Sequence, residues 1–310
     1  MDKIKYDLIT ILGPTACGKT KFAAYLSSRI NGEIISADSR QVYRKMNLGT
    51  GKDYEDYIVN GKKIPYHLVD ILEPGYKFNV FEFQRYFLNA YNEIRARKNI
   101  PVLCGGSGMY IDAVTKSYKL MPVPPDKKLR KELESKSLEE LAEILASYRK
   151  PHNITDTDTK KRAIRAIEIE KYYTANPESK HDYPEISNIF LGIKFDRTSV
   201  KKRITDRLHE RLNKGMVEEV QNLLNEGLKP EDLIYYGLEY KYITQYIKGD
   251  LDYNDMVEKL NIAIQQFAKR QMTWFRKMER EGAKIHWFDG YMPMDEKIIR
   301  AMELTCFKPA

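Results

Sequence analysis

Features that would place the chain in a specialised class are scarce. Of its 310 residues only three are cysteines, Cys17, Cys104 and Cys306, which are too scattered for a disulfide framework or a zinc site. No apolar run approaches the length that crosses a membrane. The first residues run directly into a strand pattern without the features of a signal peptide. With no low-complexity segment or internal repeat, the sequence predicts a globular cytoplasmic protein without membrane association.

Charge, in contrast, is abundant and unbalanced. Charged residues make up 31% of the chain and hydrophobic residues 42%, and the formal net charge is +8. Basic residues gather at 197–214 and again at 269–280, where Trp274 and Phe275 lie among them. The excess favours a polyanionic partner, although many basic proteins are merely soluble.

The most informative stretch matches the phosphate-binding pattern G-x-x-x-x-G-K-[ST]. An apolar run at 8–12 precedes it and predicts a buried strand, and the helical spacing of 21–30 follows it. In that context the backbone N–H groups converge on an anion, the lysine reaches its terminal phosphates and the threonine hydroxyl can bind Mg²⁺. We therefore predict a diphosphate or polyphosphate site at Gly13, Pro14, Thr15, Ala16, Cys17, Gly18, Lys19 and Thr20.

Strand and helix patterns alternate through the first third of the chain. Strands are expected at 33–36, 67–72 and 100–104, and helices at 80–98 and from 109. This alternation predicts an α/β fold, a P-loop NTPase-like parallel sheet flanked by helices. A proline-rich stretch at 121–125 interrupts it, and charged helical sequence follows to about 183.

Strand character returns at 189–195, and the chain is then mostly helical to 280, before a short strand-like stretch at 284–288. We expect a core of 1–122 and 188–310 with a helical C-terminal region, and a helical insertion domain at 123–187.

Two further turns carry candidate functional groups. Asp38 follows a predicted strand, at the edge where open α/β sheets bind ligands. Its carboxylate could help to hold Mg²⁺, cap a helix or act as a general base, and the sequence does not separate these roles. The turn Gly105-Gly106-Ser107-Gly108 allows a ligand to approach the backbone closely, although such a cluster is often simply a tight turn.

Two helical stretches carry basic residues at regular spacing. Arg203, Arg207 and Arg211 share one helix face, which is either solvated and balanced by Asp206 and Glu210 or directed at phosphate oxygens. In the second stretch, at 266–276, core packing of Phe267, Gln271 and Trp274 would leave the basic residues Lys269, Arg270 and Arg276 exposed to phosphates.

These motifs, taken in order, resemble the tRNA dimethylallyltransferases, also called isopentenyltransferases. The similarity begins with the glycine loop and Ile35-Ser-Ala-Asp-Ser-Arg-Gln-Val-Tyr43, and it spans nearly the whole chain. It continues through 46–52, 67–71, 105–110, 161–168 and 207–211, and it ends at Ala268-Lys-Arg-Gln-Met-Thr-Trp-Phe-Arg276.

The resemblance implies a prenyltransferase that uses dimethylallyl diphosphate. The acceptor would be N6 of the adenosine at tRNA position 37, just 3′ of the anticodon, in tRNAs that read codons beginning with U. The loop would hold the diphosphate leaving group rather than ATP, with Mg²⁺ partly held by Thr20. We expect a monomer.

The resemblance also implies roles for particular residues. Asp38 matches the base, Lys19 and Arg207 would stabilise the diphosphate, and Ser107 stands where the family usually has threonine. The expected tRNA contacts are Asp38, Ser39, Arg40, Gln41, Ser107, Arg130, Lys161, Arg162, Arg165, Lys269, Arg270, Gln271, Trp274 and Arg276, with those of the insertion gripping the anticodon stem-loop.

The chain departs from the family pattern at a few positions, and other functions compete. Gly237-Leu238-Glu239-Tyr240 stands where Gly-Tyr-Arg-Gln is usual, so a carboxylate replaces an expected arginine. An adenylate prenyltransferase would share the glycine loop and Asp38 but would not need the basic insertion. A small-molecule kinase would consume ATP, and a non-catalytic RNA-binding module would leave Lys19 and Thr20 without a purpose.

Overall fold

The computed structural model describes residues 6–148, 154–177 and 183–305. It divides into a core unit, Met1–Ser117 with Glu185–Ala310, and an insertion unit, Tyr118–Pro184. The N-terminal stretch before residue 6 and Cys306 lie outside the described residues. Within the described ranges, we find no helix with the length and apolar character that a membrane crossing requires.

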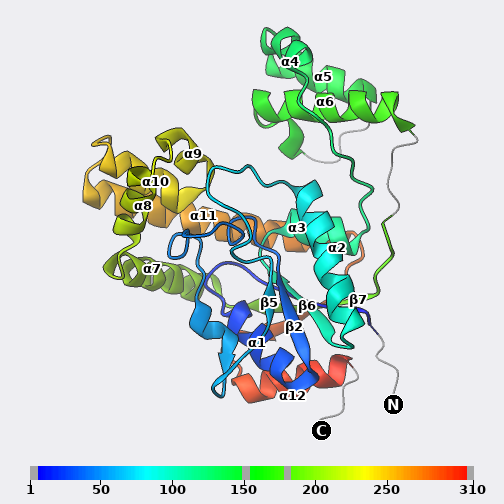
Figure 1. Ribbon diagram of the computed structural model, residues 1–310, viewed down its shortest axis with the longest axis vertical. Helices are drawn as coiled ribbons and strands as arrows, with labels where there is room; N and C mark the ends of the chain where they lie inside the picture. The colour runs from blue at the N-terminus through cyan, green and yellow to red at the C-terminus, as the bar shows by residue number, and fades with distance from the viewer. Residues whose placement is uncertain (1–5, 149–153, 178–182, 306–310) are drawn as a thin grey trace. The chain divides into compact units, whose positions relative to one another are not determined.

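The core unit is built on a six-stranded sheet in the order β5-β2-β6-β1-β7-β8, in which every pairing is parallel (Figure 1). β1 pairs with β7, which places Ile9 beside Ile189 although the whole insertion separates them in the sequence. The strands are β1 (Leu8–Leu12), β2 (Gly32–Ser36), β5 (Tyr66–His67), β6 (Ile100–Gly105), β7 (Asn188–Lys194) and β8 (Ile285–Asp289), and β3 (Ile58–Val59) and β4 (Lys62–Lys63) form a separate hairpin.

Helices cover both faces of this sheet. On one face, α1 (Lys19–Ile30) and α12 (Met294–Thr305) pack on the strands, and the rings of Phe22 and Phe288 lie 5.4 Å apart. On the other, α2 (Val80–Ala96) packs on α3 (Gly108–Thr115), with Phe83 stacked on Tyr110 at 4.4 Å. Because side chains alternate between the two faces of a strand, β1 contributes side chains to the cores on both sides of the sheet. Its carboxyl end lies at the edge where open α/β sheets bind ligands.

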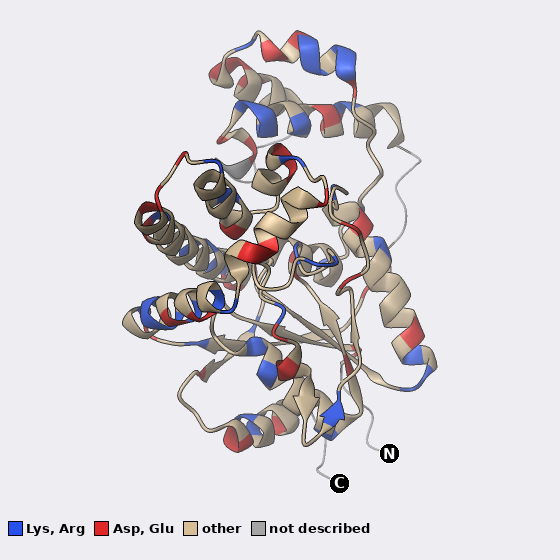
Figure 2. Cartoon of the chain, turned by 60° about the vertical axis from the view of Figure 1, so that its left-hand side comes forward, with Lys and Arg blue, Asp and Glu red and all other residues tan. Residues whose placement is uncertain are grey.

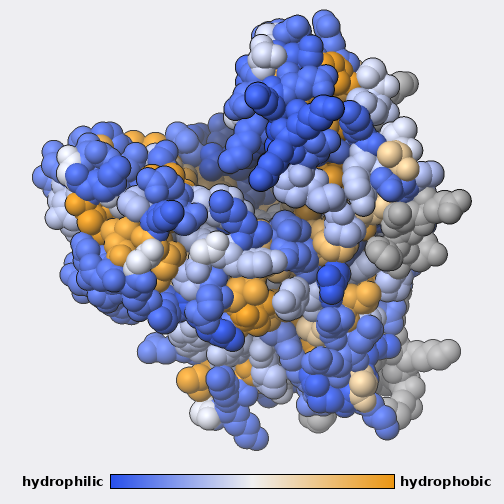
Figure 3. All heavy atoms as spheres, turned by 45° about the horizontal axis from the view of Figure 1, so that its top comes forward, coloured by the Kyte–Doolittle hydropathy of each residue, from blue (hydrophilic) through white to orange (hydrophobic). Residues whose placement is uncertain are grey.

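The chain after β7 forms the helical C-terminal region. Its helices are α7 (Arg197–Asn213), α8 (Met216–Asn225), α9 (Pro230–Tyr235), α10 (Leu238–Ile247) and α11 (Tyr253–Arg280). α11 contacts α3, α7 and α10, so this long helix joins the region to the sheet. Hydrophobic side chains also reach the surface among hydrophilic ones on the lobe formed by α8 to α10, at the left of Figure 3.

The insertion unit has its own small core. Its helices are α4 (Lys127–Glu134), α5 (Leu138–Tyr148) and α6 (Lys160–Ala175). Basic and acidic positions occur on α4 and α6, whereas α5 carries acidic residues and no basic ones (Figure 2). Leu133, Leu141 and Ile167 are buried between the helices. Glu168 is also buried, and Arg130 and Arg165 both donate to its carboxylate.

The predicted fold class is confirmed, and two local predictions need correction. The strand expected at 67–72 is wrong beyond His67, because Leu68 and Asp70 adopt left-handed backbone conformations, with φ of 61° and 55°. That segment instead packs along 42–44, where Leu72 bridges to Tyr43. In addition, α12 was not expected, although its buried Ile298 and Met302 complete one face of the sheet.

Candidate functional site

Three turns meet at the carboxyl ends of neighbouring strands. They follow β1, β2 and β6, which are adjacent in the sheet. A Cβ atom built on Gly105 would lie 2.4 Å from the Ala37 carbonyl oxygen, and one on Gly106 would lie 3.2 Å from that of Gly13. Only glycine allows the loops to pack this closely. The predicted anion loop, Asp38 and Ser107 are therefore carried on turns that contact one another.

The glycine loop has the backbone that an anion site requires. Ala16 and Gly18 have φ of 62° and 79°, and α1 begins directly after them at Lys19. The half-buried Lys19 folds back on the loop, with Nζ 3.4 Å from the Pro14 carbonyl oxygen. Beneath the loop, burial raises the pKa of the Cys104 thiol to about 12, against the opposing effect of Lys19. The loop floor is therefore neutral, and its positive groups are the helix N-terminus and Lys19.

Asp38 is half-buried and held by a local turn. Its Oδ1 accepts a hydrogen bond from the Arg40 backbone N–H at 2.8 Å, and no helix follows in 39–50. The helix-cap interpretation is therefore wrong, and the base and metal roles remain. Nearby, the Gln41 side chain accepts from the Ser36 hydroxyl at 2.9 Å and donates to the Gly51 carbonyl at 3.1 Å, so its amide groups bond within the protein.

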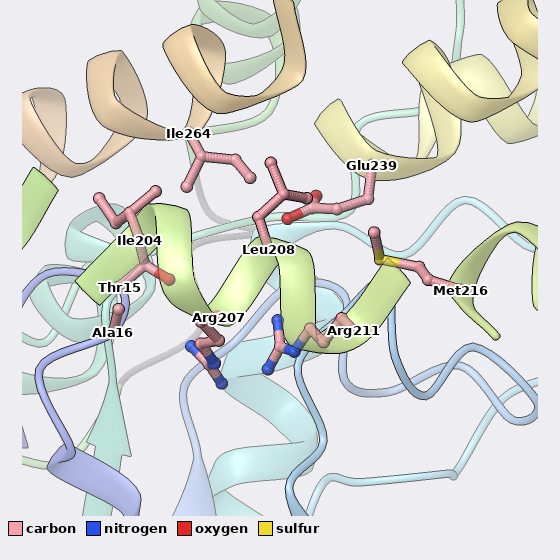
Figure 4. A pocket seen from close by; sticks show the side chains of 9 residues that line it. All are labelled: Thr15, Ala16, Ile204, Arg207, Leu208, Arg211, Met216, Glu239 and Ile264. Atoms are coloured by element: carbon pink, nitrogen blue, oxygen red, sulfur yellow. The ribbon is translucent and has the colours of Figure 1, made fainter. Parts of the chain in front are cut away.

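The three arginines of α7 contact two parts of the core unit, the glycine loop and Asp53. Arg203 Nε donates to the Ala16 carbonyl at 2.8 Å. The guanidinium groups of Arg207 and Arg211 lie 2.6 Å and 3.0 Å from the carboxylate of Asp53, and they extend side by side from α7 (Figure 4). Since Arg211 is 11% exposed and Asp53 pairs with both groups, Arg207 and Arg211 are not solvated charges balanced by their own helix.

Arg207 and Arg211 line a small pocket with two residues of the glycine loop, Thr15 and Ala16. Burial acts to raise the pKa of Asp53, but the two arginines outweigh it, and the pKa is lowered. Glu239 reaches the pocket from α10, and burial raises the pKa of its carboxyl group, in contrast to that of Asp53. The lining is completed by Ile204, Leu208, Met216 and Ile264.

Asp53 and Glu219 were not identified from the sequence. The Glu219 carboxylate on α8 accepts hydrogen bonds from three consecutive backbone N–H groups, those of Asn47, Leu48 and Gly49, at 2.7–3.0 Å. It also accepts one from the Tyr240 hydroxyl at 2.7 Å. The only signal was the segment 46–52, which the family resemblance included without assigning it a role.

The basic and aromatic segment of α11 divides into an inner and an outer face. Gln271 is buried, accepts from the Thr15 N–H at 2.8 Å and donates to the Gly106 carbonyl at 3.0 Å. Trp274 Nε1 donates to the buried Asp112 at 2.8 Å, and its ring lies against Gly108. Gln271 and Trp274, expected at the tRNA interface, thus bond inside the core unit. The outer face carries the exposed Lys269, Arg270 and Arg276. Phe267, which was expected in the core, is exposed as well.

The expected tRNA contacts of the insertion unit differ in their surroundings. Arg130 and Arg165 are tied to the buried Glu168, so part of their charge is already neutralised. Arg162 pairs with the exposed Asp158, and Lys161 is exposed. Ser39 and Ser107 are half-buried beside the site in the core unit.

Comparison with known proteins gives a consistent result. A family model described as IPP transferase matches residues 41–278. The chain is 58% identical to tRNA dimethylallyltransferase 2 of Phocaeicola vulgatus, covering 97% of this chain and 98% of the relative. It is 59% identical to tRNA dimethylallyltransferase 2 of Bacteroides fragilis, covering 94% and 96%.

Solved structures are also similar. The full-length tRNA isopentenylpyrophosphate transferase of Bacillus halodurans matches with a TM-score of 0.70 and 31% identity, covering 97% of this chain and 96% of that one. A eukaryotic dimethylallyltransferase acting on tRNA matches with a TM-score of 0.75 at 20% identity, covering 97% and 80%, a likeness of fold.

Proposed function

Because this chain belongs to the IPP transferase family, we propose that it transfers the dimethylallyl group of dimethylallyl diphosphate to N6 of adenosine 37 in tRNA. It is a prenyltransferase that modifies tRNA. The observation that carries the finer proposal is the contact between the three turns. They join an anion-binding loop to the turn of a half-buried carboxylate, Asp38.

The acceptor needs a base. An adenine amine is a poor nucleophile, so the reaction gains when its proton is removed as N6 bonds to the first carbon of the prenyl group. Asp38 takes this proton. The Arg40 N–H holds one carboxylate oxygen, which orients the other. Ser107, on the neighbouring turn, supplies a hydroxyl for hydrogen bonding to the acceptor.

The reaction also needs groups that stabilise the negative charge that develops on the diphosphate as it leaves. The bond between the allylic carbon and the diphosphate oxygen breaks, and the electron pair leaves with the diphosphate. The loop N–H groups, Lys19 and Arg207 stabilise that charge, since they are already oriented before the reaction. Arg203 holds the loop backbone through the Ala16 carbonyl.

The residues present fit a magnesium ion bound mainly through substrate. The described parts of the chain hold no group of three or more side chains suited to a metal. Mg²⁺ at phosphates typically uses one or two protein oxygens and the substrate itself. The half-buried Thr20 hydroxyl at the start of α1 would be one of these oxygens. Bound there, the ion would neutralise charge on the leaving diphosphate.

The acceptor must leave its stack in the anticodon loop to reach the donor. Ser39 and Arg40 lie next to the base and are proposed to contact loop nucleotides, while the outer face of α11 meets phosphates. In the insertion unit, Lys161 and Arg162 are the more available cations. The protein is proposed to act as a monomer in the cytoplasm.

Incubation with labelled dimethylallyl diphosphate separates the candidate functions. We expect label on tRNA and none on AMP. Label on AMP alone would indicate an adenylate prenyltransferase, and transfer of the γ-phosphoryl group of ATP would indicate a kinase. Either of these results would overturn the proposal.

A further inference from the structure

A tyrosine outside the proposed catalytic residues lies at the surface within about 6 Å of two cations. Tyr235, the last residue of α9, is 38% exposed. The Arg40 guanidinium carbon lies 5.0 Å from the centre of its ring, and Lys77 Nζ lies 5.7 Å from it. We call these three side chains the Tyr235 platform.

The backbone that carries the Tyr235 ring is anchored to the rest of the core unit. Arg40 Nη2 donates to the Tyr235 carbonyl at 3.1 Å. The neighbouring Tyr236 is buried edge-on against Tyr43 at 4.6 Å, and its hydroxyl bonds to the backbone of Gly75 and Tyr76. A short helix would fray alone, but these contacts fix α9 so that the Tyr235 ring keeps its position.

The platform adjoins the proposed base. The Arg40 backbone N–H bonds to Asp38, so one residue contributes its backbone to the base and its guanidinium to the platform. Of the charged groups around the ring, Arg40 and Lys77 are cationic, and Asp232 lies 3.9 Å from Lys77. An exposed ring with a planar guanidinium and a second cation suits an unstacked nucleobase and its phosphate.

We propose that the Tyr235 platform binds a nucleotide of the anticodon loop that flanks the acceptor adenosine. The base stacks on the surface made by the Tyr235 ring and the Arg40 guanidinium, and Lys77 pairs with a neighbouring phosphate. This inference rests on the proposed function, because it needs a tRNA acceptor at Asp38.

Replacement of the ring tests the inference. Tyr235→Leu removes the π face but keeps an apolar side chain, whereas Tyr235→Phe removes only the hydroxyl. Tyr253→Leu is the control, since Tyr253 is 44% exposed on the same unit. Affinity for an anticodon stem-loop RNA should fall at least about fivefold in Tyr235→Leu and stay within about twofold in the other two variants. The KM for dimethylallyl diphosphate and the Tm should not change.

Equal affinities for Tyr235→Leu and Tyr253→Leu would overturn the inference, and so would an equal loss in Tyr235→Phe, which would point to the hydroxyl. Tyr235→Trp keeps the ring and gives an independent test if the leucine variant folds poorly. Its emission should be quenched by the stem-loop, unlike that of Tyr253→Trp, and unchanged emission would also overturn the inference. Transfer of label to tRNA by the unaltered enzyme is measured first, so failure of the proposed function is distinguished from failure of the platform.

Discussion

Asp38 is oriented by backbone groups that lie next to it in the sequence and in the sheet. The Arg40 N–H fixes Oδ1, and the Gly105 turn packs on the preceding Ala37. The carboxylate is thus presented at the strand end without help from another side chain. Its position after a strand was predictable because a strand pattern is a local property, whereas its role as the base was implied only by the family resemblance and stays a prediction.

Replacing Asp38 with asparagine tests the base. Asp38→Asn keeps an oxygen for the Arg40 N–H but removes the proton acceptor, so we expect kcat to fall by about 100-fold or more. Affinity for tRNA should stay within a few-fold, as measured by filter binding. Asp295→Asn, the same change at an exposed position of α12, is the control. Unchanged turnover in Asp38→Asn would remove the residue as the base.

Gln271 has a role that its sequence motif concealed. Its amide joins the glycine loop to the Gly106 turn, over separations of 256 and 165 residues. Gln271→Glu keeps the acceptor for Thr15 but loses the donor to Gly106, and we expect a loss of about 1–3 kcal/mol in unfolding free energy. Urea denaturation measures it, with the exposed Gln266→Glu on the same helix as control. Equal stability of the two variants would argue against this role.

At the scale of elements, the segment 46–53 links the donor and acceptor sides of the site. Gly51 accepts from Gln41 on the acceptor side, and Asp53 pairs with Arg207 and Arg211 on the donor side. Glu219 holds the beginning of this segment by its backbone. The position of the segment 46–53 therefore depends on the carboxylate of Glu219.

Removal of that carboxylate should loosen the segment. Glu219→Ala leaves three backbone N–H groups and the Tyr240 hydroxyl without their acceptor, and hydrogen bonds to charged groups contribute about 1.5–3 kcal/mol each. We expect faster amide exchange at 47–53 and a higher KM for dimethylallyl diphosphate. Glu218→Ala, exposed in the same helical turn, should change neither. Matching exchange rates in the two variants would contradict the prediction.

Sequence patterns captured elements better than the contacts between them. The strands and helices around the glycine loop follow from periodicity over ten or so residues, and so does the predicted fold class. The contacts of Asp53 with Arg207 and Arg211 span 154 and 158 residues, which no local pattern encodes. The strand at 67–72 was misjudged because apolar composition does not reveal left-handed backbone at Leu68 and Asp70.

At the scale of the whole molecule, several of the basic side chains bond within the protein. Arg203, Arg207 and Arg211 bond to protein oxygens, as do Arg130 and Arg165 in the insertion unit. Net charge alone therefore does not show which cations are available to RNA. The cations on the outer face of α11 are exposed and are the better candidates for long-range attraction.

Charge reversal on that face tests its role. The double variant Lys269→Glu with Arg270→Glu should bind tRNA more weakly and show a shallower dependence of log affinity on log salt, because fewer phosphates are neutralised. Lys62→Glu with Lys63→Glu, on the β3–β4 hairpin, is a control of equal charge change. If both doubles have the same salt slope, the α11 face does not meet phosphates.

The pairing of β1 with β7 has a consequence for synthesis on the ribosome. The glycine loop emerges before the β7 strand beside β1 and before the arginines that face it, which come about 180 residues later in the chain. A nascent chain that ends within the insertion has the glycine loop but lacks α7, which carries the arginines that face the loop. Activity should thus arise abruptly and late in translation, once α7 and α11 have emerged to close the two sides.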